Sequence, residues 1–119
     1  MRGKLGDRAR LLHIVEAIDE IQQYLQEIDY NGFAEHSMMR FACIKQLEII
    51  GEASNHLSSE TRAKNQQVAW SEIIALRNIL VHEYFGIDSK IIWDILQTDM
   101  PMLRDQVETL IRKLPESKN

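Results

Sequence analysis

The sequence contains few of the residues that build turn-rich or cross-linked proteins. Its 119 residues include five glycines, two prolines and one cysteine, and aromatic residues make up 7%. This scarcity, together with the absence of an alternating strand pattern, favours helices over a β architecture. The single cysteine, Cys43, excludes an internal disulfide. Because it sits in an apolar run, we expect a small buried hydrophobic residue in a reduced, cytoplasmic protein.

Long hydrophobic runs are also absent. No apolar stretch approaches the ~18 residues of a membrane span, and residues 1–4 lead into a charged segment instead of a signal peptide. With 45% hydrophobic and 27% charged residues, the composition is that of a globular protein with no membrane segment. We expect one domain over residues 1–119, with an ordered core at about 7–114.

A positive charge excess is missing as well, since the formal net charge is −4. Proteins that hold nucleic acid over a broad surface are usually basic. Any contact with RNA must therefore come from a local site, which more than one chain could complete.

Apolar residues spaced three and four apart predict helices in the first half of the chain. The first helix is expected over residues 7–28 with Asp7 as its N-cap, and Asn31-Gly32 then predicts a turn. The second is expected over residues 35–57 with apolar residues on more than one face, so it should be central. Gly51 costs this helix roughly 1 kcal/mol relative to alanine, which indicates close approach of another backbone.

The second half of the chain predicts two more helices after a polar connection over about 58–67. The third starts near Trp70 and ends before Gly86. Asp88 is expected to cap the fourth, which Pro101 must kink or restart because proline lacks a backbone N–H, and Asp99 could cap the restart. We therefore predict an all-α fold, an up-and-down bundle of four helices, or five if Pro101 divides the last.

Polar residues interrupt the apolar third helix in one short segment that holds Arg77, Asn78, His82 and Tyr84. At about 100° per residue, Asn78 and His82 lie about 40° apart, whereas Arg77 and His82 lie about 140° apart. One protomer would not easily bring both to the same phosphate. Either the helix deforms near His82 or a second chain completes the site, and we favour a two-fold dimer.

These residue types suit cleavage of RNA. RNA carries its own nucleophile, the 2′-hydroxyl, so cleavage needs a base and an acid, and the histidine pKa suits both roles near neutral pH. Arg77 can stabilise charge on the phosphate, while Asn78 can orient the imidazole of His82 or donate to a phosphate oxygen. We expect no metal or other cofactor, because the remaining histidines lack Cys or carboxylate partners at zinc spacing: His13, His36 and His56.

The segment RNILVHEY at residues 77–84 resembles the R-x4-H motif of the HEPN superfamily, in the longer form typical of HepT toxins. Further similarity runs along the chain from residue 7 to about 114. It is carried by Asp7-Arg8, Ile50-Gly51-Glu52-Ala53, Trp70, Tyr84-Phe85-Gly86-Ile87-Asp88 and Trp93.

This resemblance implies an all-helical homodimer that cuts RNA without metal, with Arg77 and His82 as catalytic residues and Asn78 in support. It also implies a toxin of a toxin–antitoxin pair, whose partner is a small nucleotidyltransferase antitoxin of the MNT type. In that family the tyrosine at the position of Tyr84 is modified with AMP, which blocks the site. The expected product of cleavage is a 2′,3′-cyclic phosphate.

Structural alternatives accompany each of these interpretations. His82 could be a core histidine, and Arg77 could pair with Glu52 or Asp88 as a structural bridge. Trp70 and Trp93 are most simply core anchors. Basic residues elsewhere are expected on solvated faces, although some could line an RNA groove: Arg8, Arg10, Arg104, Arg112 and Lys113. As an alternative function, the chain is a non-catalytic helical adaptor for a nucleotidyltransferase.

Overall fold

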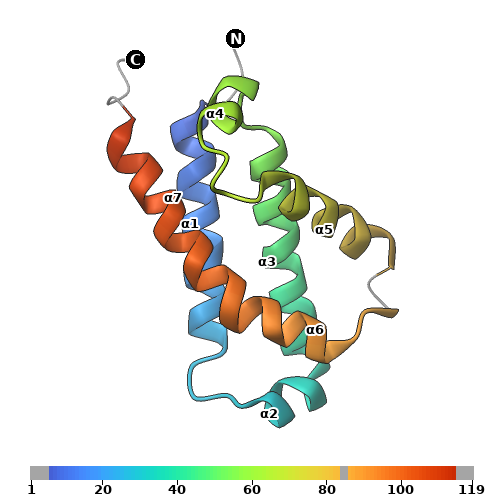
Figure 1. Ribbon diagram of the computed structural model, residues 1–119. Helices are drawn as coiled ribbons and strands as arrows, with labels where there is room; N and C mark the ends of the chain where they lie inside the picture. Colours follow the sequence, from blue (N-terminus) through green and yellow to red (C-terminus); the bar gives the residue numbers. More distant parts are fainter. Residues whose placement is uncertain (1–5, 84–85, 115–119) are drawn as a thin grey trace.

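Helices make up most of the computed structural model, which describes residues 6–83 and 86–114 (Figure 1). The described residues contain no strand, so the all-α prediction is confirmed. None of these helices combines the length and hydrophobicity needed to cross a membrane. The elements in chain order are α1 (Asp7–Tyr24), α2 (Tyr30–Glu35), α3 (Ser37–Asn55), α4 (Ser59–Lys64), α5 (Trp70–Glu83), α6 (Ser89–Asp94), the π-helix η2 (Ile95–Asp99) and α7 (Met100–Lys113).

The long helix α1 packs between α3 and α7, and the three run side by side (Figure 1). The short helix α2 closes one end against α3 and α6, and α4 lies near the start of α1 at the other end. Helix α5 packs on α3 and crosses it at an angle. As a result, α5 lies at the edge of the bundle.

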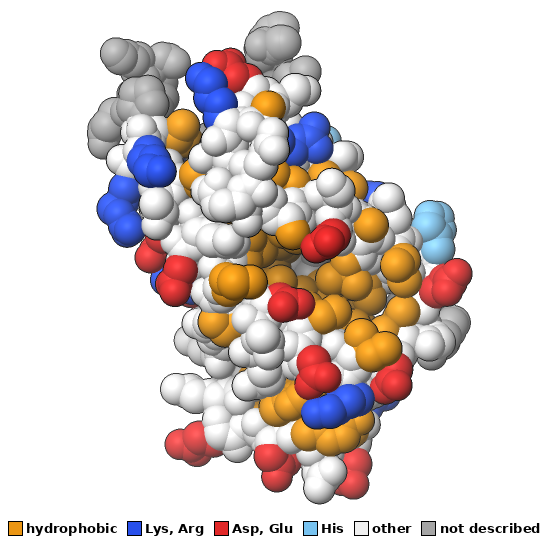
Figure 2. Space-filling view, in the orientation of Figure 1, with side chains coloured by type: hydrophobic (Ala, Val, Ile, Leu, Met, Phe, Trp, Pro, Cys, Tyr) orange, Lys and Arg blue, Asp and Glu red, His pale blue; other side chains and the backbone are white. Residues whose placement is uncertain are grey.

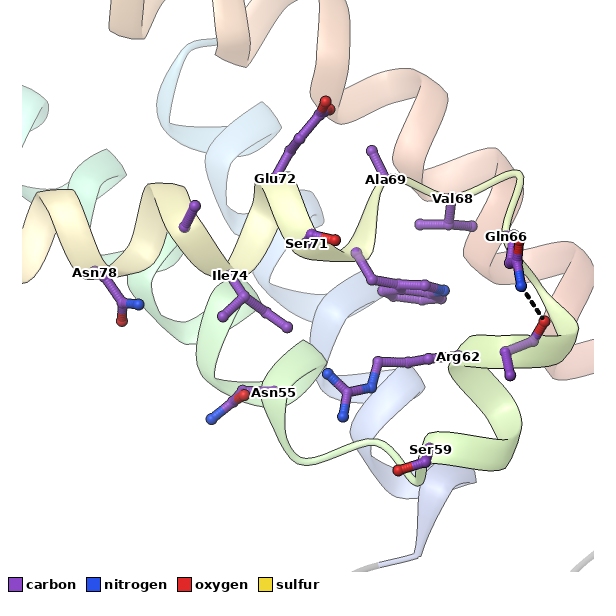
Figure 3. A pocket seen from close by; sticks show the side chains of 13 residues that line it. Asn55, Ser59, Arg62, Gln66, Val68, Ala69, Ser71, Glu72, Ile74 and Asn78 are labelled. Carbon is purple, nitrogen blue, oxygen red and sulfur yellow. Dashed lines mark hydrogen bonds between the residues drawn. The ribbon is translucent and has the colours of Figure 1, made fainter.

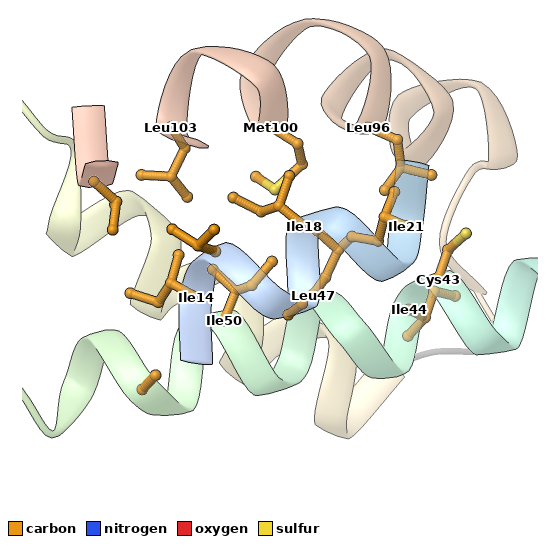
Figure 4. Packing of buried hydrophobic residues seen from close by; sticks show 14 of the residues in the cluster. Ile14, Ile18, Ile21, Cys43, Ile44, Leu47, Ile50, Leu96, Met100 and Leu103 are labelled. Carbon is orange, nitrogen blue, oxygen red and sulfur yellow. The ribbon is translucent and has the colours of Figure 1, made fainter. Parts of the chain in front are cut away.

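The core forms along the apolar stripe of α1, where Leu11, Ile14 and Ile18 are fully buried. Figure 4 shows Ile14, Ile18 and Ile21 between side chains of α3 and of the η2–α7 segment. Cys43 is buried in this cluster, as predicted, and burial raises the pKa of its thiol to about 11. A thiol with that pKa stays protonated near neutral pH and is a poor nucleophile.

Both tryptophans pack against the core, as expected. Trp70 is 6% exposed, and its indole nitrogen donates to the carbonyl of Asn65 at 3.0 Å. Trp93 is half-buried with its ring centroid 5.3 Å from that of the fully buried Phe33.

The structure corrects the role of Asp7. Gly6 is the N-cap of α1, and Asp7 is the first helical residue. The carboxylate of Asp7 instead accepts hydrogen bonds from the backbone N–H of Ser58 at 2.9 Å, from the Ser58 hydroxyl at 2.7 Å and from the Thr61 hydroxyl. These bonds connect the start of α1 to the start of α4.

Two short helices occupy segments where the sequence predicts a turn and a polar connection. The first predicted helix ends at Tyr24, earlier than expected, and Asn31-Gly32 lies inside α2, whose N-cap Asp29 accepts from the N–H of Gly32 at 2.8 Å. Ser58 caps α4 in the same way, accepting from the N–H of Thr61 at 3.1 Å. Side-chain caps satisfy the free N–H groups that otherwise make one or two helical turns unfavourable.

The predicted interruption at Pro101 takes the form of a π-helix. Pro101 is the second residue of α7, directly after η2, in which the N–H of Met100 donates to the carbonyl of Ile95. The prediction that Asp99 caps the restart is wrong, since Asp99 has helical backbone angles and its side chain makes no capping hydrogen bond. Asp88 does cap α6, as predicted, by accepting from the N–H of Lys90 at 2.8 Å.

The contacts of Asp7 predict a pH-dependent contribution to stability. Burial raises the pKa of this carboxyl, but the hydrogen bonds from Thr61 and Ser58 outweigh burial and hold the pKa below 3.8. A lowered pKa stabilises the fold at pH values above 3.8, and this contribution disappears as the pH falls through the folded-state pKa. We expect Asp7→Asn to reduce the free energy of unfolding by about 1–2 kcal/mol at neutral pH in urea titrations. The variant and the unmodified protein should converge in strong acid, whereas the exposed Asp99→Asn should differ little at either pH.

Candidate functional site

The approach of α5 to α3 is set at Gly51. A Cβ atom built on Gly51 would lie 2.2 Å from the Cβ of Arg77 and 3.2 Å from the carbonyl oxygen of Ile73. No side chain fits in this space, so the close approach predicted from a glycine within this helix is confirmed. The contact also sets the position of the Cβ of Arg77, from which the rest of its side chain extends.

From that point, the guanidinium of Arg77 reaches two neighbours. One Nη atom lies 2.8 Å from a carboxylate oxygen of Glu52, and the other donates to the side-chain oxygen of Asn78 at 2.9 Å. Glu52 also lies 3.4 Å from the ring of His56. The predicted ion pair with Glu52 is therefore present. The side-chain amide of Asn78 contacts Arg77, whereas the sequence suggested that it could orient the imidazole of His82.

These contacts leave Arg77 able to bind a ligand. Its side chain is 32% exposed, and a guanidinium has five N–H donors, of which these two partners use only some. Held between a carboxylate and an amide, the group keeps a fixed orientation with donors to spare. Such an arrangement is suited to a phosphate.

His82 lies at the exposed end of α5. Its side chain is exposed and makes no hydrogen bond or ion pair with the residues that the structure describes, so the core-histidine alternative is wrong. Helix α5 is a regular α-helix from Trp70 to Glu83. The angle of about 140° between Arg77 and His82 around the helix axis is therefore retained, and the structure brings Arg77 together with Asn78 but not with His82. Tyr84 lies outside the described residues.

A cleft of about 840 Å³ borders the site on the Asn78 side (Figure 3). It lies between α4 and α5, and Trp70 and Ile74 are apolar parts of its lining. Figure 3 shows Ile74 on one side of the cleft and Asn55 and Arg62 on the other. Within the described part of the chain, the guanidinium of Arg62 forms no hydrogen bond or ion pair, although its charge helps to lower the pKa of Asp7. No sequence pattern indicates this cleft, because its walls come from separate helices.

Helix α5 carries two large apolar side chains that are exposed. Only Trp70 and Leu80 of this helix are buried, whereas Ile79 is 48% exposed and Val81 39% exposed. A groove of about 300 Å³, lined in part by Leu76 and Met102, separates α5 from η2 and α7. Figure 2 shows hydrophobic side chains gathered on this face.

Comparison with known proteins relates the chain to ribonucleases. A family model described as "Ribonuclease HepT-like" matches residues 14–110. A protein of Methanocaldococcus jannaschii whose name gives it as a candidate RNase is 43% identical over 101 residues, which cover 85% of this chain and 93% of that protein. A protein of Thermococcus cleftensis named "Probable ribonuclease HepT" is 35% identical over 107 residues, covering 90% of this chain and 97% of its own length. No solved structure matches the chain.

The contact at Gly51 predicts a large effect of one methyl group. Gly51→Ala should force α5 away from α3, because the clash involves the Cβ of Arg77 and not the flexible end of its side chain. We expect the free energy of unfolding to fall by about 1–3 kcal/mol in urea titrations, as in other overpacked sites. Gly86→Ala serves as the control, since a Cβ there meets no atom within 4 Å. Equal stability of the two variants would contradict the close approach.

Proposed function

The chain belongs to the HepT-like ribonuclease family, and from this membership we propose that it is an endoribonuclease toxin with a site shared between two protomers. In this proposal, Arg77 of one protomer and His82 of the other act on the same phosphodiester. Asn78 holds the guanidinium in position. The reaction requires no metal ion.

The observation that carries the proposal is the position of Arg77 and His82 on one regular helix. Arg77 is directed toward α3 by Gly51 and Glu52, whereas His82 is exposed at the end of α5. A two-fold axis beside α5 would bring the imidazole of one copy to the arginine of the other. The uncovered apolar residues Ile79 and Val81 support association through this helix, because their burial between two copies is favourable.

The chemistry follows from the two residue types. The imidazole of one His82 accepts the proton of the 2′-hydroxyl, whose oxygen then attacks the adjacent phosphorus. The guanidinium of Arg77 stabilises the negative charge that develops on the phosphate oxygens. The bond to the 5′-oxygen breaks as that oxygen takes a proton from water, and His82 then passes the proton it accepted to the solvent. The products are a 2′,3′-cyclic phosphate and a 5′-hydroxyl.

A partner that controls this activity belongs to the same proposal. We infer a small nucleotidyltransferase antitoxin of the MNT type that transfers AMP to Tyr84. Since Tyr84 follows His82 by two residues, the added nucleotide would place bulk and negative charge close to the imidazole. Both effects oppose binding of an RNA phosphate.

A non-catalytic role is the second candidate. The net charge of −4 favours it, and so does the pairing of Arg77 with Glu52, because both weaken attraction of RNA. In that case the helical chain serves only as an adaptor for the nucleotidyltransferase. It would form a tight complex with that partner and cut no RNA.

RNA cleavage by the purified protein tests the proposed function. Cutting should persist in EDTA and leave 2′,3′-cyclic ends. Arg77→Ala and His82→Ala should each lower the rate about 100-fold or more, the usual effect of removing an acid–base group or a charge-stabilising donor. His36→Asn is the matched control, since His36 is exposed and its capping bond to the N–H of Met39 suits asparagine. A His82→Ala protein as fast as the control would exclude catalysis at this site.

Mass spectrometry after co-expression with the nucleotidyltransferase encoded nearest to this chain tests the modification. The unmodified sequence should gain the mass of AMP and lose its RNA cleavage, whereas Tyr84→Phe should gain none. Tyr30→Phe, which removes a hydroxyl from α2, should be modified like the unmodified sequence. An equal mass gain on Tyr84→Phe would rule out Tyr84 as the acceptor.

A further inference from the structure

A second pocket lies on the side of Arg77 that faces away from the large cleft. It has a volume of about 280 Å³, several times the ~30 Å³ of a water molecule. Three helices contribute its charged side chains. These are Arg10 and His13 from α1, Lys45, Glu48 and Glu52 from α3, and Arg77 from α5.

The charges in this pocket do not cancel. Glu52 pairs with Arg77 at 2.8 Å, and Glu48 lies 4.0 Å from Lys45. Arg10 is the remaining permanent cation, and His13 adds a second positive charge when it is protonated. The pocket is therefore locally positive in a chain whose net charge is −4.

Arg10 is also short of hydrogen bonds. Its Nε atom is buried and has no partner among residues 6–83 and 86–114, and its guanidinium forms no ion pair with them. A buried donor without an acceptor is unfavourable, and native structures seldom keep one unless another group satisfies it. The pocket that Arg10 lines gives its guanidinium access to an acceptor from outside the chain.

We propose that this pocket binds a backbone phosphate of the RNA substrate next to the phosphate that is cut. The inference rests on the proposed function, since Arg77 lines the pocket and also belongs to the candidate catalytic site. Because every phosphodiester in RNA is flanked by others, a strand held at Arg77 has a neighbouring phosphate available for Arg10. The planar guanidinium matches the geometry of phosphate oxygens. A phosphate there would accept hydrogen bonds from the terminal N–H groups of Arg10 and offset its unpaired charge.

Binding of single-stranded RNA to a His82→Ala protein, which is expected not to cut, tests this inference. Fluorescence anisotropy with a labelled oligoribonucleotide, measured over a series of salt concentrations, gives both the affinity and its salt dependence. Adding Arg10→Gln should weaken binding several-fold and make the slope of log affinity against log salt shallower by about 0.7, the value for one phosphate contact on a single strand. Arg10→Lys should keep most of the slope, because the charge remains.

Arg112→Gln in the same background is the matched control. It removes the same charge from an exposed arginine in the last turn of α7 that lines none of the described pockets. Far-UV circular dichroism should show the same helicity for all variants. Equal affinity and slope for Arg10→Gln and Arg112→Gln, or a parent protein that binds no RNA, would overturn the inference. If Arg10 contributes to RNA binding but the protein with His82 intact cuts no RNA, the proposed function is overturned and the phosphate site is not.

Discussion

The close contact between Gly51 and Arg77 determines the geometry of the region around α5. Because Gly51 has no side chain, α5 can approach α3 very closely. The Cβ of Arg77 then occupies the space that the Cβ of any other residue at position 51 would need. A glycine in the middle of a helix costs roughly 1 kcal/mol relative to alanine. The result is that packing fixes the Cβ of Arg77, while Glu52 and Asn78 fix the orientation of its guanidinium. Such pre-organisation reduces the entropy lost when a phosphate binds.

The same helix separates the groups that the chemistry must bring together. Because α5 is regular, His82 extends from a different side of the helix than Arg77, and no local distortion brings it back. Ile79 and Val81, which lie between Arg77 and His82 in the sequence, have exposed apolar side chains. A second copy of the chain would both cover these side chains and complete the pair. It would also bring two copies of Arg77 close together. This local positive charge explains how a chain with a negative net charge could bind RNA.

Much of the fold could be predicted from the sequence, because long helices carry a strong apolar period. The short helices could not, since Asp29 and Ser58 begin either a turn or a short helix, and only the tertiary structure decides which forms. The partner of Asp7 lies more than fifty residues away. For the site, residue types indicated the chemistry and Gly51 indicated a close approach. The sequence could not show that Arg10 lies in one pocket with Arg77, because that pocket is built from three helices.

In the proposed dimer, each site takes its arginine from one protomer and its histidine from the other. The most direct measurement is RNA cleavage by mixed dimers, made by co-expressing Arg77→Ala and His82→Ala chains with different affinity tags and purifying through both. In such a dimer, one shared site loses both groups and the other keeps both. Cleavage should therefore recover to well above that of either mutant homodimer. If the mixed dimer is as inactive as the two homodimers, a site shared between protomers is contradicted.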